Sequence, residues 1–125
     1  KAPVVTSASI TPTHGVEGTT FTVSLTAEDL EGSRIGTLYL YYVDPLGGAV
    51  MLSTCSNSPC QQTRISGPSS GHDLNRSGTY TFNYVYVGDE LGNTAYYHSD
   101  GTVSGSDLHE TTHSLVLPDI TVELD

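Results

Sequence analysis

The chain has no tryptophan, two cysteines and only four lysines and arginines among its 125 residues. Fourteen aspartates and glutamates set a formal net charge of −10 at pH 7, which repels phosphate backbones and anionic lipid surfaces. No apolar run approaches the ~20 residues that a helix needs to cross a bilayer. These deficits predict a chain that neither binds nucleic acid nor inserts into a membrane.

Helical patterns of any length are also missing, whereas serine, threonine and β-branched residues are abundant. Thirteen glycines and six prolines fit a series of short strands joined by turns. One domain of this length buries roughly two thirds of its unfolded surface, so residues 1–125 are interpreted as a single domain. We expect an excised mature segment of a larger protein, because no leader precedes Lys1.

Alternation of apolar and polar residues predicts where the strands lie. The clearest half-buried strand begins near Phe21, and Pro3 to Ile10 is typical of an edge strand because Pro12 follows it closely. The other predicted strands are Ile35–Val43, Ala49–Leu52, Thr79–Val87, Asn93–His98, Val116–Leu124 and one weak strand within Gln61–Arg76. We therefore predict an all-β antiparallel sandwich of about seven or eight strands.

The run from Thr79 to Val87 does not fit a regular strand. Regular pleating would place Tyr84 and Tyr86 on the same face as Tyr80, and would leave the two valines on the polar face. A β-bulge near Asn83 and Tyr84 would shift the period and turn the following residues inward: Tyr80, Phe82, Val85 and Val87. We predict that bulge.

The two cysteines, Cys55 and Cys60, lie in the sequence C-S-N-S-P-C. Four intervening residues are too many for a thioredoxin-type C-x-x-C motif, and a metal site would need further ligands nearby, the closest histidine in sequence being His72. We predict a local disulfide at a hairpin tip, which would stabilise the fold by roughly 2 kcal/mol on the loop-entropy model. Such a bond also indicates an oxidising, extracellular compartment.

Three segments carry a resemblance to a known family. They are A-E-D-L-E-G-S-R-I at Ala27–Ile35, Y-Y-V-D-P at Tyr41–Pro45, and G-T-Y-T-F followed by D-E-L-G-N within Gly78–Asn93. Their order and spacing resemble those of bacterial immunoglobulin-like extracellular domains. The resemblance implies an immunoglobulin-like sandwich. It also implies a non-catalytic spacer or accessory module of secreted or cell-surface proteins such as adhesins, whose partners are neighbouring domains of the same polypeptide. The chain departs from the vertebrate pattern, since it lacks tryptophan and a cysteine pair placed to bridge two sheets.

Residues 109–113 read H-E-T-T-H and match the H-E-x-x-H zinc signature of metalloproteases. That chemistry needs both histidines on one helix face, a third protein ligand and an open position. Threonines are poor helix formers, Pro118 ends any helix quickly, and only twelve residues follow His113. We expect at most a short helical turn near 107–112 and no enzymatic activity. A non-catalytic zinc ion on His109 and His113 is a remote alternative.

Two acidic turns, Glu28–Gly32 and Asp89–Asn93, would meet at one end of an immunoglobulin-like sandwich. A hard divalent cation would relieve the repulsion between their carboxylates. The predicted calcium ligands are Asp29, Glu31, Asp89, Glu90 and Asn93. The alternative is that Asp89 and Asn93 only hydrogen-bond their own turn. No other cofactor is expected.

Eight tyrosines raise the question of carbohydrate binding, because flat sugar rings pack against aromatic side chains. The candidates for an outward face are Tyr39, Tyr41, Tyr96 and Tyr97. Packing in the core or against a neighbouring strand is the alternative. An outward row of these rings on a flat sheet would favour a module that binds a glycan or a protein ligand over a pure spacer.

Overall fold

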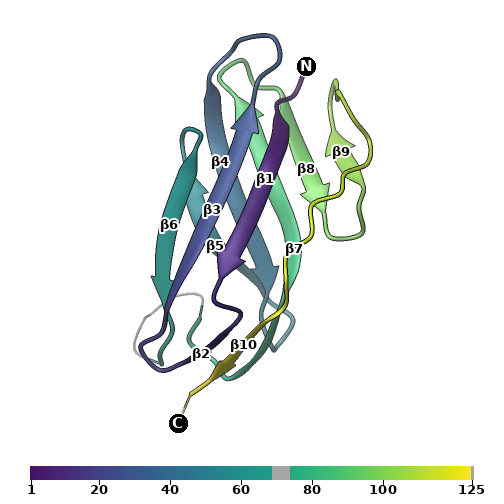
Figure 1. Cartoon of the computed structure of the whole chain (residues 1–125). Coiled ribbons are helices and arrows are strands. Elements are labelled where there is room, and N and C mark those ends of the chain that lie inside the picture. Colours follow the sequence, from purple (N-terminus) through teal and green to yellow (C-terminus); the bar gives the residue numbers. More distant parts are fainter. Residues whose placement is uncertain (69–73, 125) are drawn as a thin grey trace.

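A computed structural model describes residues 1–68 and 74–124, so that His72 lies outside the described residues. These residues form two β-sheets and no helix (Figure 1). The smaller sheet has the order β1 (Val4–Thr11), β3 (Thr20–Glu28), β6 (Cys60–Ile65). The larger has the order β2 (His14–Val16), β10 (Ile120–Glu123), β7 (Gly78–Asp89), β4 (Ile35–Val43), β5 (Ala49–Cys55), with β8 (Thr94–His98) on β7 and β9 (Val103–Gly105) on β8. The predicted all-β sandwich is confirmed, but with ten described strands instead of seven or eight.

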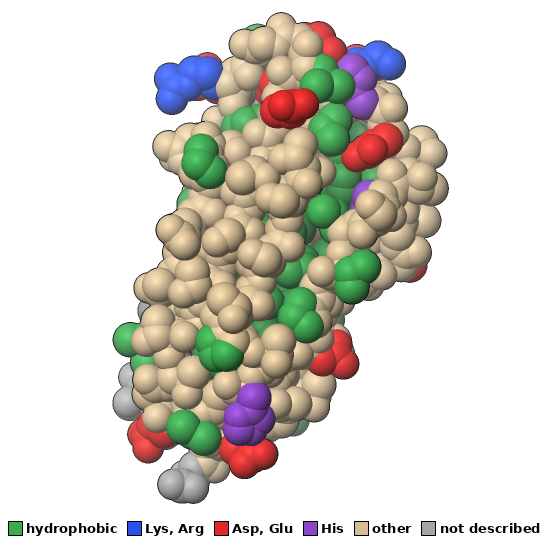
Figure 2. All heavy atoms as spheres, viewed as in Figure 1, with side chains coloured by type: hydrophobic (Ala, Val, Ile, Leu, Met, Phe, Trp, Pro, Cys, Tyr) green, Lys and Arg blue, Asp and Glu red, His purple; other side chains and the backbone are tan. Residues whose placement is uncertain are grey.

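The core lies between the two sheets and is built mainly by alternation of inward and outward side chains. In β3, Phe21, Val23 and Leu25 are fully buried, while the threonines and serines between them face outward. In β4, Leu38 and Leu40 point inward to the same core. Figure 2 shows the outer face of the smaller sheet, which consists mainly of uncharged polar side chains and backbone. A hollow of about 440 Å³ separates β1 from residues 110–115 on that side.

The predicted bulge in β7 is present. Tyr41 of β4 pairs with Tyr84, but the next residue, Tyr42, pairs with Phe82, so that Asn83 is the additional residue. Tyr80, Val85 and Val87 are buried, and Phe82 packs against the core from a partly buried position. The bulge therefore turns the two later tyrosines of β7 away from the core.

The additional strands explain the difference in strand count. β1 ends at Thr11, and the chain then passes to the larger sheet, where β2 pairs in parallel with β10. The closing strand is limited to Ile120–Glu123 and also pairs antiparallel with β7. In β1, a register shift between Val5 and Ser7 accompanies the burial of Val5 in the core. Three-residue strands such as β2 and β9 are too short to show a period.

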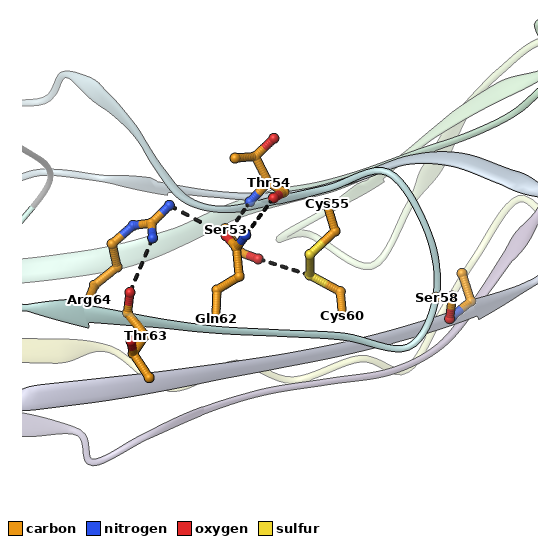
Figure 3. The surroundings of a disulfide bond; sticks show 9 residues. Ser53, Thr54, Cys55, Ser58, Cys60, Gln62, Thr63 and Arg64 are labelled. Carbon is orange, nitrogen blue, oxygen red and sulfur yellow. Dashed lines mark hydrogen bonds between the residues drawn. A yellow bond between two sulfur atoms is a disulfide. The ribbon is translucent and has the colours of Figure 1, made fainter.

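The disulfide between Cys55 and Cys60 is confirmed, with a Cα–Cα distance of 6.0 Å (Figure 3). Its position corrects the sequence interpretation, because β5 belongs to the larger sheet and β6 to the smaller one. The bond therefore joins the two sheets along one edge of the sandwich and does not lie at a hairpin tip. Gln62 supports the same edge, since its amide donates to the Thr54 carbonyl at 2.7 Å and accepts from the Thr54 N–H at 2.9 Å.

Residues 106–119 form an irregular segment with several bends and no helix, so the expected helical turn near 107–112 is absent. Asp107 has a φ of 56°, outside the helical region. The segment instead packs against the turn between β8 and β9, because Val103 donates to the Thr111 carbonyl and His113 to the Gly101 carbonyl, each at 2.9 Å. Among residues 1–68 and 74–124, no helix long and apolar enough to span a bilayer occurs.

Candidate binding face of the larger sheet

Six aromatic side chains share the outer face of the larger sheet, and we call them the tyrosine face. They come from three adjacent strands, β4, β7 and β8: Tyr39, Tyr41, Tyr84, Tyr86, Tyr96 and His98. Strand register explains the grouping, because residues that pair across antiparallel strands point to the same side. Tyr86 pairs with Tyr39 on one side and with Tyr96 on the other, and Tyr84 pairs likewise with Tyr41 and His98. The result is two aromatic rows running across the strands.

The rings form one continuous cluster. Tyr41 and Tyr84 stack with centroids 4.7 Å apart, and Tyr86 lies 4.8 Å from Tyr96. Tyr39 is 5.7 Å from Tyr86, while Tyr84 joins the two rows through an edge contact with Tyr96 at 5.3 Å. Mutual packing of this kind holds the rings in place before any ligand arrives. A rigid aromatic surface loses little conformational entropy on binding.

The tyrosine face is partly open to solvent and carries no aspartate, glutamate, lysine or arginine among its six members. Tyr96 is 37% exposed, and the other tyrosines are half-buried. The ring of His98 is held by the Ser104 hydroxyl at 2.7 Å. Burial, followed by the neighbouring Tyr41 and Tyr96, raises the pKa of Tyr84, so its hydroxyl stays neutral. The face therefore combines flat apolar surfaces with uncharged hydroxyl groups.

The sequence predicted only some of the residues of the tyrosine face. Tyr39, Tyr41 and Tyr96 lie on it as predicted, but Tyr97 is only 1% exposed and belongs to the core. Side chains alternate along β8, so two adjacent tyrosines cannot both face outward. Tyr84 and Tyr86 were missed as candidates, although the predicted bulge already implied that both turn away from the core.

A shallow pocket of about 400 Å³ opens at the end of the tyrosine face nearest the disulfide. Its lining consists of Gly36, Tyr39, Thr54, Cys55, Ser56, Asn57 and Gln62. Ser56 and Asn57 are exposed, whereas the Gln62 amide is fixed by its two hydrogen bonds to Thr54. The pocket thus presents amide and hydroxyl groups beside an aromatic ring, in a volume typical of small-ligand sites.

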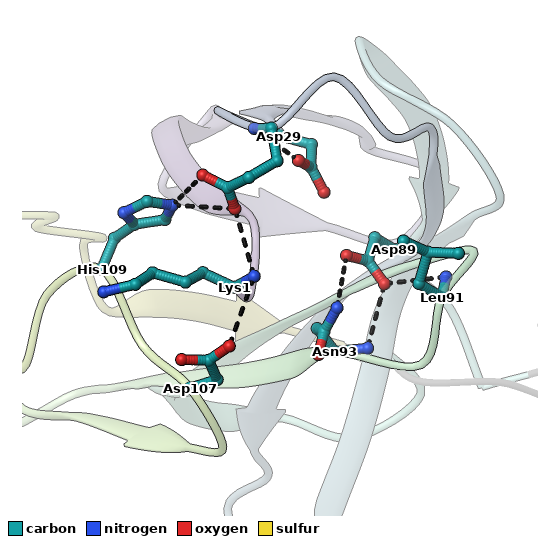
Figure 4. A network of polar contacts seen from close by, with 8 residues as sticks. Lys1, Asp29, Asp89, Leu91, Asn93, Asp107 and His109 are labelled. Carbon is teal, nitrogen blue, oxygen red and sulfur yellow. Dashed lines mark hydrogen bonds and ion pairs between the residues drawn. The ribbon is translucent and has the colours of Figure 1, made fainter.

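The predicted calcium ligands lie in turns at the same end of β4 and β7 as this pocket, and most of them are engaged with other groups (Figure 4). The buried Asp89 carboxylate accepts the N–H groups of Leu91 and Asn93, each at 2.9 Å, and the Asn93 side-chain amide at 3.1 Å. Glu31 pairs with His109 at 2.8 Å, and Glu90 pairs with Arg34 at 3.5 Å. Asp89 therefore organises its own turn, as in the alternative interpretation.

One carboxylate oxygen near these turns, Asp29 Oδ2, is buried without a hydrogen-bond partner among the described residues. The other Asp29 oxygen accepts the N–H of Glu31 at 2.8 Å. Within residues 1–68 and 74–124, no group of three or more histidine, cysteine, aspartate or glutamate side chains is arranged to hold a metal ion. Calcium at these turns stays a prediction without geometric support.

The three ionisable side chains of the H-E-T-T-H motif have separate partners. His109 contacts Glu31, Glu110 accepts the Tyr97 hydroxyl at 2.8 Å, and His113 donates to the His98 carbonyl at 2.6 Å. Because the segment is not helical, the two histidines do not share one face of a helix, as the zinc signature requires. Each side chain instead fixes this segment against a different part of the sandwich.

The hydrogen bonds of Asp89 predict an acid-sensitive fold. Burial raises the pKa of Asp89, but hydrogen bonds from the Asn93 side chain and backbone outweigh it, so this pKa lies below its ordinary value. A lowered pKa contributes stability above the unfolded value of ~3.9 that is lost as the pH falls through the folded value. We expect Asp89→Asn to cost about 1.5 kcal/mol of unfolding free energy at pH 7, typical of a hydrogen bond to a charged group.

Urea unfolding of both proteins between pH 7 and pH 2.5 measures this contribution. The wild type should lose stability faster than Asp89→Asn below about pH 4, so that the two curves converge. The comparison cancels the contributions of carboxylates that do not interact with Asp89. Parallel curves over the whole range would contradict the assignment to Asp89.

The chain matches no protein-family model, no curated protein and no solved structure in the three comparisons made. The resemblance to bacterial immunoglobulin-like domains therefore stays a prediction. A functional assignment depends on what the tyrosine face and its adjoining pocket can bind.

Proposed function

We propose that this chain is a non-catalytic carbohydrate-binding module of a larger extracellular protein, and that the tyrosine face is its binding surface. The observation that carries the proposal is the outward cluster of five tyrosines and one histidine on three adjacent strands. Core packing does not require these rings, because the other face of the same strands fills the core. The opposite outer face of the sandwich has serines and threonines at the corresponding positions of β3.

Carbohydrate suits the chemistry of this face. The C–H groups of a sugar ring pack on an aromatic plane, while its hydroxyls hydrogen-bond to neighbouring polar groups. Thr54 and Ser104 pair with Tyr39 and Tyr96 at the two ends of one row and supply such hydroxyls. Protein interfaces are enriched in arginine beside their aromatic side chains, and the tyrosine face contains no arginine.

Charge narrows the class of glycan further. The chain carries a net charge of −10, so that acidic polysaccharides are repelled at long range. The tyrosine face contains no lysine or arginine to offset this repulsion. The ligand is therefore a neutral glycan.

A spacer role is the second candidate, supported by the ends of the chain. Figure 1 shows the N-terminus at one end of the long axis and the last described residues at the other. Domains with ends so placed can be joined in series in a secreted or cell-surface protein, which is the arrangement implied by the resemblance to bacterial immunoglobulin-like adhesin modules. The disulfide is compatible with that extracellular location. A spacer needs no exposed aromatic cluster, so the binding role is the one we favour.

Calorimetric titration with neutral hexasaccharides tests the proposal. We expect the wild type to bind at least one of cellohexaose, laminarihexaose and chitohexaose. It should not bind the acidic hexagalacturonate. Tyr84→Ala removes the ring that joins the two rows and should weaken binding by at least about tenfold, as for an aromatic hot spot. Ile65→Ala, at a 57% exposed residue of β6 in the smaller sheet, is the control. No binding by the wild type, or equal binding by Tyr84→Ala, would overturn the carbohydrate role.

A further inference from the structure

The two aromatic rows end differently at β5. Tyr39 pairs with Thr54, which lines the pocket, whereas Tyr41 pairs with Met51, a side chain without a strong hydrogen-bonding group. At the other end, Tyr96 pairs with Ser104 of β9. One row therefore runs unbroken over five strands, from β9 through β8, β7 and β4 to β5: Ser104, Tyr96, Tyr86, Tyr39, Thr54.

The row is regular because neighbouring strands are evenly spaced. Strands lie ~4.8 Å apart, and the five positions span roughly 19 Å. The centroids of Tyr96 and Tyr86 are 4.8 Å apart, and those of Tyr86 and Tyr39 are 5.7 Å apart. An extended β-1,4-linked glycan advances by a similar distance per sugar, so that successive sugars meet successive rings.

The pocket closes this row at the Tyr39 end. Residues 56–59 connect the two sheets beyond the end of β5, and Ser56 and Asn57 from this connection line the pocket. The disulfide anchors both ends of the connection, and the Gln62–Thr54 contacts fix the adjacent wall. A glycan chain lying along the row would therefore meet the polar residues of the pocket at the Tyr39 end instead of a continuing flat surface.

We infer that a neutral β-1,4-linked glycan lies along Tyr96, Tyr86 and Tyr39, and that its terminal sugar occupies the pocket beside Ser56 and Asn57. This inference rests on the proposed function and specifies the direction and the end of the ligand. The rings supply stacking surface for internal sugars, and the Asn57 amide supplies a donor and an acceptor for the hydroxyls of the last sugar. The second row, Tyr41 with Tyr84, supports the first by ring packing.

Variants of the pocket test the inference with cellohexaose as the probe. Asn57→Ala should weaken binding about fivefold, a loss expected for one or two hydrogen bonds. Ser56→Trp fills the pocket and should weaken binding by about tenfold or more, as for loss of one subsite. Ser9→Trp, at an exposed position on the outer face of the smaller sheet, is the control for adding an indole ring and should bind as the wild type does. Melting curves establish that each variant is folded.

The outcomes separate the two proposals. Weakening by both pocket variants but not by Ser9→Trp supports the terminal-sugar site. Full binding by both pocket variants, together with a loss in Tyr86→Ala, overturns the pocket and leaves the carbohydrate role standing. Binding of laminarihexaose but not of cellohexaose would overturn the inference that an extended β-1,4-linked glycan lies along the row, because β-1,3-linked chains curve. The carbohydrate role itself would stand. Binding of no hexasaccharide overturns the proposed function and this inference together.

Discussion

Replacing Tyr97 by phenylalanine is expected to lower the free energy of unfolding by about 3 kcal/mol, although the substitution removes a single oxygen atom. The Tyr97 hydroxyl donates to Glu110 at 2.8 Å and accepts the N–H of Val5 at 3.2 Å. Phenylalanine would leave a buried amide and a carboxylate without their partner, and an unsatisfied buried group costs ~1–3 kcal/mol. Urea unfolding monitored by circular dichroism at pH 7 measures the loss.

Glu110→Gln is the control for this effect, since glutamine keeps an acceptor for the Tyr97 hydroxyl and should cost clearly less than Tyr97→Phe. Alkaline pH gives an independent measurement. Burial, and then the hydrogen bond to Glu110, raise the pKa of Tyr97. This stability is present below the unfolded value of ~10 and is lost as the pH rises beyond it. A phenylalanine variant as stable as the wild type would contradict the structural role of Glu110.

Removing the disulfide is expected to lower the melting temperature by about 8 °C. A ring closed by so few residues contributes roughly 2 kcal/mol on the loop-entropy model. For a domain of this size, each 1 kcal/mol shifts the midpoint by ~4 °C. The variant is Cys55→Ala with Cys60→Ala, compared with the oxidised wild type by calorimetry.

Reductant provides the matched control, because excess dithiothreitol should lower the midpoint of the wild type and leave that of the double variant unchanged. The Gln62–Thr54 contacts keep the two sheets joined along the same edge, so folding should survive the loss. An oxidised wild type that melts at the same temperature as the double variant would show that the bond adds nothing to stability.

The fold could be predicted from the sequence wherever one face of a strand is buried throughout. In β3, Phe21, Val23 and Leu25 alternate with polar residues, so only one assignment of the buried and exposed faces is possible. The bulge at Asn83 was predictable as well, because only a shifted period brings Val85 and Val87 inward. By contrast, β2 and β9 have three residues each, and their existence depends on neighbours that no local pattern specifies.

The candidate site was less predictable because it depends on strand pairing. Tyr39 and Tyr86 are far apart in sequence, and only the pairing of β4 with β7 brings them together. The same limit explains why the disulfide was predicted at a hairpin tip. A short spacing between two cysteines is compatible both with a hairpin and with a connection between two sheets. Pairing order is a property of the whole chain, and alternation along one strand does not reveal it.

The bulge in β7 makes the length of that strand a determinant of what the protein can bind. Deleting Asn83 would restore a regular pleat beyond it, sending Tyr84 and Tyr86 toward the core and Val85 and Val87 toward solvent. Insertions of one residue nearby would have the same consequence. Single substitutions can adjust the ligand surface gradually, but a change in the length of this strand exchanges interior and exterior at once. Descendants of this sequence can therefore vary the loops in length while the span from Gly78 to Asp89 keeps its twelve residues.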